Sequence, residues 1–220
     1  MTVAFSSKVE AGSRDESTSH RKPGAVQQCD DKLSSSRLQI EGYVIISADG
    51  MLADASGVMP PALKFPGDQA FFESSLDAAA LIVHGRNSYE DQPRSPQRRR
   101  IVLTRHVDGV ATDPDNPRAT LWNPVHTSFG DALAHSGVRE GVIAVIGGPG
   151  VFAMFLDRYN TFWLSEAPRI KLPGGIGAFP GIPERSARDI LSAHGLAAGE
   201  ARMLDPADEV TVTPWRRMRS

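Results

Sequence analysis

Two spacings of apolar residues alternate along the chain from Leu38 onward. Short runs rich in apolar and β-branched residues are bounded by glycine or polar residues, which is typical of strands that are buried on both faces. Between them, apolar residues recur three and four positions apart, as they do on one side of a helix. The predicted strands are 40–46, 81–84, 101–104, 142–146, 161–165, 201–204 and 209–213, and the predicted helices are 68–79, 128–135, 151–157 and 184–194.

This alternation of strand and helix predicts the fold class. Strands separated by helices favour an α/β fold with a mainly parallel central sheet that is flanked by helices. The last two predicted strands follow one another directly, so we expect a C-terminal antiparallel hairpin. A turn is predicted at 48–50, and the spacing of Ser128 and Asp131 is that of a capping box at the start of a helix.

Residues 1–37 differ in composition from the rest of the chain. They are rich in polar and charged residues and almost free of aromatic ones, so they cannot bury enough apolar surface to offset the entropy lost on ordering. We expect a disordered N-terminal extension at 1–37 and one globular domain at 38–220. A functional tail and a start site placed too far upstream remain alternatives.

Composition and charge exclude several classes of protein. The 220 residues carry a formal net charge of −2, which gives no global attraction to nucleic acid or to an anionic membrane. Cys29 is the single cysteine, so neither an intramolecular disulfide nor a multi-cysteine zinc site can form, and the histidines show no metal-binding spacing. No apolar run approaches the roughly 20 residues of a membrane span. We therefore expect a cytoplasmic protein without a metal site and without a nucleic-acid or membrane partner.

The most informative motif joins a predicted buried strand to a predicted helix through Gly147, Gly148 and Gly150. Glycine allows the backbone to approach a phosphate closely, and a helix N-terminus supplies free N–H donors. A pyrophosphate site is one interpretation, and a tight turn that binds nothing is the other. The motif is not G-x-G-x-x-G and lies late in the chain, which disfavours a standard Rossmann dehydrogenase.

Two further strand ends carry groups suited to phosphate. Gly85-Arg86-Asn87-Ser88 follows one strand, and Thr104-Arg105 follows the next. The planar guanidinium group of arginine can pair with two phosphate oxygens. Taken alone, each motif is better explained as a solvated strand end that binds no ligand. Because all three motifs follow strands, one phosphate-rich ligand lying across the strand ends would use them together.

Asp68 has two interpretations. It follows Pro66-Gly67 at a predicted helix start, where aspartate is a favoured N-cap. It can also be a partly buried acid that faces a ligand pocket, with Phe72 as an aromatic wall of that pocket. The two roles can coexist.

The order of these segments resembles the dihydrofolate reductase superfamily, which includes the reductase domain of the bifunctional riboflavin-biosynthesis deaminase-reductase. The resemblance covers about 38–217. It depends on the segments Ile45–Ala53, Asp68–Phe72, Val83–Glu90, Ile101–Arg105, Val145–Phe152 and Phe162–Ser165.

The resemblance implies NADPH as cofactor and assigns candidate roles. Asp68 falls at the position of the acid that binds the pterin, and Ser165 falls at the hydroxyl position that supports this acid. Phe72 and Phe152 would contact the substrate. A cis peptide between Gly147 and Gly148 is also implied. The implied cofactor-binding residues are Leu52, Ala53, Gly85, Arg86, Asn87, Ser88, Thr104, Arg105, Gly147, Gly148, Gly150 and Val151.

Departures from the family pattern leave the substrate open. Ser47–Ala53 and Tyr89–Pro93 look more like the riboflavin-pathway relatives, which lack the pterin-binding acid, whereas the tyrosine common after the glycine motif is Phe152 here. The first hypothesis is an NADPH-dependent reductase of dihydrofolate or a related pterin. The second is reduction of a phosphoribosylaminopyrimidine or another heterocycle, and the third is a nucleotide-binding module without turnover. The oligomeric state stays open, with a homodimer as one outcome.

Overall fold

A computed structural model describes residues 38–88, 92 and 94–218. The predicted N-terminal extension at 1–37 lies outside the described residues, as does most of the Tyr89–Pro93 segment.

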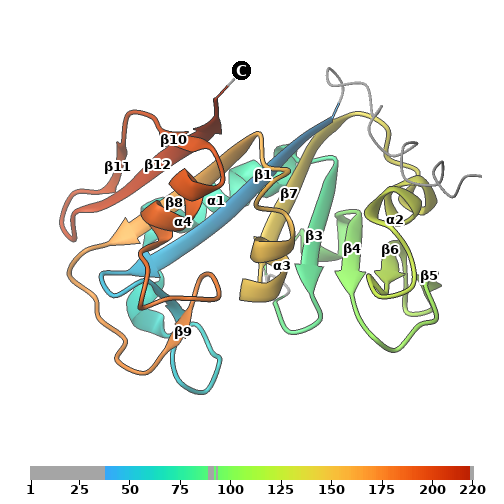
Figure 1. The fold of residues 1–220 in the computed structure, drawn as a ribbon, viewed down its shortest axis with the longest axis horizontal. Coiled ribbons are helices and arrows are strands. Elements are labelled where there is room, and N and C mark those ends of the chain that lie inside the picture. Colours follow the sequence, from blue (N-terminus) through green and yellow to red (C-terminus); the bar gives the residue numbers. More distant parts are fainter. Residues whose placement is uncertain (1–37, 89–91, 93, 219–220) are drawn as a thin grey trace, which may run out of the picture. The chain divides into compact units, whose positions relative to one another are not determined.

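In the described residues, a ten-stranded sheet forms the centre of the domain (Figure 1). Its parallel part has the order β8-β1-β7-β3-β4-β6, and antiparallel strands extend both sides of it. On one side β12 pairs with β8 and carries β10 and β11, and on the other side β5 pairs with β6. The mainly parallel sheet and the C-terminal antiparallel hairpin are therefore confirmed. The strands are β1 (Leu38–Ser47), β3 (Leu81–Gly85), β4 (Arg100–Leu103), β5 (Val110–Asp113), β6 (Asn116–Trp122), β7 (Gly141–Gly147), β8 (Thr161–Ala167), β10 (Leu196–Ala198), β11 (Arg202–Asp205) and β12 (Val210–Arg217).

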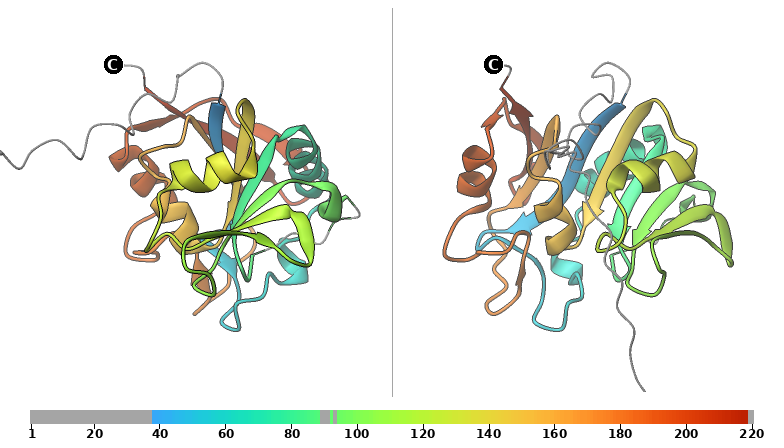
Figure 2. Two further views of the ribbon diagram at one scale, coloured as in Figure 1. Left: turned by 90° about the vertical axis from the view of Figure 1, so that its right-hand side faces the viewer. Right: turned by 45° about the vertical axis from the view of Figure 1, so that its right-hand side comes forward.

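Helices cover both faces of this sheet. Helix α1 (Pro66–Ala78) lies on one face, and α2 (Phe129–Ser136), α3 (Pro149–Met154) and α4 (Ala187–Ala193) lie on the other (Figures 1 and 2). Because strand side chains alternate between faces, the sheet contributes to a separate apolar cluster on each side. The α1 side contains Tyr43, Leu76, Ile82 and Ala144, and the other side contains the larger cluster around α2, α3 and α4.

The helix boundaries differ from the predicted ones at their ends. Helix α1 begins at Pro66, two residues before the predicted start, because proline has a helical φ and lacks only an N–H that the first turn leaves unbonded. The capping box at α2 is confirmed, since the Ser128 hydroxyl accepts from the N–H of Asp131 and the Asp131 carboxylate accepts from the N–H of Ser128. No helix in the described part of the chain is long and apolar enough to cross a membrane.

The loops after β1 and β8 pack against each other at the carboxyl edge of the sheet. The short strand β2 (Met51–Ala53) pairs with β9 (Ile176–Gly177), and the N–H of Ala48 donates to the carbonyl of Ile170 at 2.8 Å. The carboxylate of Asp49 accepts from the N–H of Leu172 at 3.0 and 3.1 Å. The turn predicted at 48–50 is thus held in place by contacts far away in sequence.

Candidate active site

The glycine turns after β7 and β3 lie in contact. Strands β7 and β3 are parallel neighbours, so their carboxyl ends meet at one edge of the sheet. A Cβ placed on Gly148 would lie 3.1 Å from the hydroxyl of Ser88, and one placed on Gly85 would lie 3.7 Å from the N atom of Gly148. The turns after β7 and β3 are therefore direct neighbours in the structure. The sequence had suggested only that both could bind the same ligand.

The Gly147–Gly150 turn has the backbone that the resemblance implies. The Gly147–Gly148 peptide is cis, and Gly147 has a φ of +116°, which favours glycine. The carbonyl of Gly148 accepts from the N–H groups of Val151 and Phe152 at the start of α3. A Cβ on Gly150 would meet nothing within 4 Å. The turn therefore presents an open backbone surface at the edge of the sheet.

The third motif adjoins the second. Strand β4 pairs with β3, and Nη1 of Arg86 lies 2.6 Å from Nε2 of His106. The N–H of His106 donates to the hydroxyl oxygen of Thr104 at 3.2 Å. Arg86 and Arg105 are exposed and Thr104 is nearly buried. The turn after β3 and the loop after β4 thus meet through Arg86 and His106.

Asp68 is the third residue of α1 and is 8% exposed. The N-cap position is occupied by Phe65, and no side chain caps this helix. The N-cap interpretation of Asp68 is therefore wrong, because Pro66 starts the helix and moves Asp68 into its first turn. The interpretation as a largely buried acid remains.

Asp68 interacts with Ser165, the second residue that the resemblance singles out. Burial raises the pKa of Asp68 above its ordinary value, and the hydrogen bond from the Ser165 hydroxyl opposes this rise. Ser165 is 2% exposed and lies beside Ile45 of β1, on the sheet face that α1 covers. Two residues far apart in the sequence thus form one buried polar pair.

Phe72 connects this pair to the glycine turn. It lies one helical turn after Asp68 and packs in the same cluster as Ile146, which directly precedes Gly147. An acid, an aromatic side chain and a glycine turn are therefore grouped toward the carboxyl edge of the sheet, on the α1 side.

Phe152 does not join this group. It is 1% exposed and packs against Phe162 and Phe179 in the cluster on the opposite face of the sheet. A Cβ on Gly147 would lie 3.1 Å from the Phe152 ring. The prediction that Phe152 contacts the substrate is therefore wrong, because its side chain lies in the core beneath the glycine turn. Leu52, on β2, also packs against this second cluster, and Ala53 is buried.

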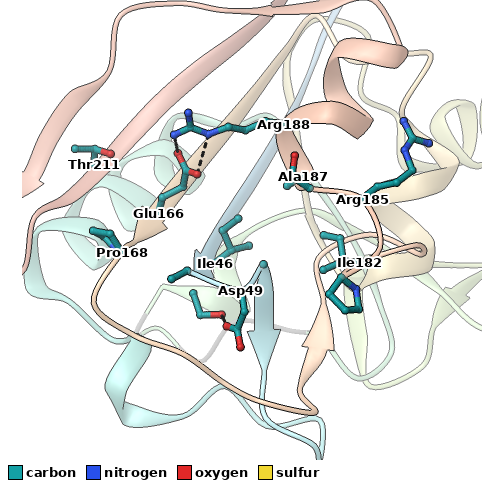
Figure 3. Close-up of a pocket in the computed structure, with 14 residues that line it drawn as sticks. Ile46, Asp49, Glu166, Pro168, Ile182, Arg185, Ala187, Arg188 and Thr211 are labelled. Atoms are coloured by element: carbon teal, nitrogen blue, oxygen red, sulfur yellow. Dashed lines mark hydrogen bonds and ion pairs between the residues drawn. The ribbon is translucent and has the colours of Figure 1, made fainter.

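A pocket of about 470 Å³, which we did not predict from the sequence, lies between the ends of β1 and β8 and the start of α4 (Figure 3). Figure 3 shows the ion pair of Glu166 with Arg188 on one side and Asp49 on the opposite side. Burial acts to raise the pKa of Asp49, but hydrogen bonds from the Ser47 hydroxyl and the N–H of Leu172 lower it below its ordinary value. The pocket lies on the α4 side of the sheet, and Asp68 does not line it. The motif Ser47–Gly50 was the sequence signal that could have indicated it.

Among the described residues, no group of three or more histidine, cysteine, aspartate or glutamate side chains is placed to hold a metal ion.

No protein-family model and no curated protein matches this chain by sequence. Solved structures match it by fold. A protein assigned to riboflavin biosynthesis from a Shewanella species is 20% identical with a TM-score of 0.55, and the match covers 82% of this chain and 99% of that one. An Enterococcus faecalis dihydrofolate reductase complexed with NADP(H) is 17% identical with a TM-score of 0.56, over 82% of this chain and 97% of that one.

A third structure is a Thermotoga maritima diaminohydroxyphosphoribosylaminopyrimidine deaminase and phosphoribosylaminouracil reductase. It is 17% identical with a TM-score of 0.56, and the match covers 84% of this chain and 58% of that one. The chain therefore has the dihydrofolate reductase-like fold that its motifs indicated.

Proposed function

We propose that this protein is an NADPH-dependent reductase of dihydrofolate or a related pterin. The observation that carries the proposal is the buried pair of Asp68 and Ser165, on the face of the sheet that adjoins the glycine turn. A buried carboxyl with its pKa raised by desolvation is costly for folding, and such groups concentrate at functional sites. The pair also falls at the two positions where the family resemblance expects the pterin-binding acid and its supporting hydroxyl.

Residues at three neighbouring strand ends fit the cofactor. Gly147, Gly148 and Gly150 would pass beneath the pyrophosphate, since a Cβ on Gly150 meets open space. Gly85–Ser88 would hold the phosphates beside them, and Thr104 with Arg105 would bind the 2′-phosphate of the adenosine. When bound, the nicotinamide would supply the hydride, which is chemistry that the side chains cannot provide.

Asp68 would anchor the substrate through its carboxylate oxygens. A pterin offers an amino group and a ring N–H side by side, and a carboxylate can accept from both. Ser165 would keep the carboxylate oriented, and Phe72 would contact the flat ring. In this proposal the protein contributes position and electrostatics, and with water Asp68 would favour protonation of the reacting nitrogen.

The decisive experiment is NADPH oxidation by the full chain, followed at the absorbance of the reduced nicotinamide. The substrates to compare are dihydrofolate, smaller dihydropterins and a phosphoribosylaminopyrimidine. We expect turnover with a dihydropterin. NADPH binding without turnover of any substrate in the panel would contradict the proposal.

A second candidate function is reduction of a phosphoribosylaminopyrimidine, as in the riboflavin pathway. The pocket formed by Ser47, Asp49 and the start of α4 favours it, because it lies at the carboxyl edge of the sheet and Arg185 among its lining residues could contact a phosphate. Turnover of this substrate alone would select this candidate. A nucleotide-binding module without turnover is less well supported, since Asp68 is 8% exposed and does not project into solvent.

A further inference from the structure

A buried histidine lies next to the turn that follows β3. His84 directly precedes Gly85 and is 2% exposed, whereas the three residues before it on β3 are apolar. Because side chains alternate along a strand, His84 shares with Ile82 the sheet face that α1 covers. Burial of an imidazole is unfavourable unless its nitrogens are hydrogen-bonded. The partners of the two ring nitrogens therefore indicate the role of this side chain.

One ring nitrogen contacts the turn itself. Nδ1 of His84 lies 2.8 Å from the carbonyl oxygen of Gly85, and because a carbonyl oxygen can only accept, Nδ1 carries a proton and donates it. The same carbonyl accepts from the N–H of Ser88 at 2.9 Å, which closes the four-residue turn Gly85–Ser88. His84 thus holds the carbonyl group on which this turn closes.

The other ring nitrogen is held by Arg100 of β4. Nε2 of His84 lies 3.3 Å from Nη1 of Arg100, and because a guanidinium group can only donate, Nε2 accepts. Nη2 of Arg100 donates to the carbonyl of Ser95 and, at 3.0 Å, to the Ser95 hydroxyl. Ser95 begins the 3₁₀ helix η2 (Ser95–Gln97), and Arg100 is 6% exposed. The buried pair therefore connects the turn after β3 with η2 and fixes the orientation of the imidazole.

We propose that His84 is a positioning residue for the cofactor site, and that it holds the turn Gly85–Ser88 in place against the Gly147–Gly150 turn through the carbonyl of Gly85. This inference rests on the proposed NADPH dependence. The two turns are close together, since a Cβ on Gly148 would lie 3.1 Å from the Ser88 hydroxyl. A change in the turn after β3 would therefore move Ser88 relative to the backbone over which the pyrophosphate would pass. Because His84 is buried, it acts through the backbone of the turn.

Two substitutions separate the two contacts of the imidazole. Asparagine places an amide N–H near the position of Nδ1, and glutamine places its amide group near the position of Nε2. H84N should therefore keep the bond to Gly85 and lose the bond to Arg100, and H84Q should do the reverse. We expect NADPH affinity within about twofold of the parent for H84N and about five- to tenfold weaker for H84Q, which is the range of one neutral hydrogen bond.

Steady-state kinetics distinguish this positioning role from a general loss of stability. In H84Q the KM for NADPH should rise, while kcat at saturating NADPH should stay unchanged. H135Q is the matched control, because His135 is an exposed histidine that contacts Thr112 of β5. Equal NADPH affinity of H84N and H84Q would overturn the inference.

Amide hydrogen exchange in the ligand-free protein measures the turn without the cofactor. Exchange of the Ser88 N–H should be about tenfold faster in H84Q than in H84N, because only H84Q loses the donor to the carbonyl on which the turn closes. The N–H of Thr104, which donates to the carbonyl of Trp122 at 2.9 Å, is the internal reference and should exchange equally in both variants.

An NMR spectrum of the His84 ring in the unsubstituted protein does not depend on the folding of a variant. It should show a proton on Nδ1. A ring whose only proton is on Nε2, or equal exchange of the Ser88 N–H in the two variants, would overturn the inference and leave the proposed function standing. Failure of the parent protein to bind NADPH would overturn the proposed function and the cofactor role of His84 together, whatever the exchange of Ser88.

Discussion

The hydroxyl of Ser165 on β8 meets the carboxyl of Asp68 on α1, and both side chains are shielded from solvent. The sheet face that presents Ser165 is otherwise apolar beneath this end of α1, with Ile45, Phe65 and Ala167 around it. Placing an ionisable group there opposes its ionisation. The pair is thus unfavourable for stability and suited to binding a polar ligand, and this conflict gives two predictions.

Asp68→Asn should reduce dihydrofolate turnover near pH 7 by at least about tenfold, because a positioned acid–base group contributes more than this to rate. Asparagine has nearly the same size but no negative charge, so folding and NADPH binding should stay near normal. Steady-state kinetics and a cofactor titration on the same preparation measure both. An unchanged rate would remove Asp68 from the catalytic machinery.

The same variant should change how stability depends on pH. The pKa of Asp68 is raised from 3.8 in the folded protein, so between 3.8 and the folded value the native state holds more protons than the unfolded state. Stability contributed by the neutral carboxyl is therefore lost as the pH rises through this window. Asp68→Asn should abolish that loss, and its advantage over the parent should grow with pH and then level off.

Denaturant unfolding at a series of pH values measures this effect. Ser165→Ala is the matched variant with the opposite direction, since it removes the hydrogen bond that restrains the rise in pKa and should extend the loss to higher pH. Parallel stability curves for Asp68→Asn and the parent would show that Asp68 titrates normally.

Arg105→Ala should reduce the preference for NADPH over NADH. NADH lacks the 2′-phosphate, so the substitution should weaken NADPH binding and leave NADH binding almost unchanged. Dissociation constants for both cofactors check this. Arg169→Ala is the control, because Arg169 is an exposed arginine that pairs with Glu209 elsewhere on the domain. Equal affinity of the parent for both cofactors would count against the assignment.

The local sequence pattern predicted most of the buried strands and the glycine turns, because runs of apolar residues and clusters of glycine can be seen in the sequence itself. It missed β6, since Asn116-Pro117-Arg118 at its start looks like a loop, although Ala119, Thr120 and Trp122 of the same strand are buried. Pairing of β6 with β4 overrides this local signal.

Contacts between distant segments account for the other differences. The aromatic residue at 152 could have faced either a ligand or the core, and its place against Phe162 and Phe179 depends on how α3 packs on β8. The contact of Arg86 with His106 likewise requires two loops to meet. Sequence spacing could place the candidate residues at strand ends, but it could not give the direction of each side chain.

Removal of residues 1–36 should leave the thermal midpoint of the domain almost unchanged. A polar segment without a core contributes few packed contacts, so its loss should cost little stability. Thermal unfolding of the shortened and full chains, followed by circular dichroism, measures the difference. A large decrease would mean that the extension docks on the domain and that the predicted boundary near residue 37 is wrong.

Gly150→Ala separates the two reasons for which a glycine can be required, backbone conformation and space for a ligand. Gly150 lies in the first turn of α3, its φ is not positive, and a Cβ there would meet nothing within 4 Å. Alanine should therefore be tolerated by the fold and should stabilise it by up to about 1 kcal/mol, because alanine has fewer conformations than glycine to lose from the unfolded chain. If the cofactor pyrophosphate passes over this turn, the added methyl group should still weaken NADPH binding by about tenfold or more, because it occupies the space that close approach of the backbone requires.

Gly147→Ala is the contrasting variant, since a φ of +116° and the Phe152 ring at 3.1 Å make alanine unfavourable in the folded state itself. Thermal unfolding and NADPH titration of both variants distinguish the cases, and a Gly150→Ala protein that is stable and binds NADPH as tightly as the parent would move the pyrophosphate site away from this turn.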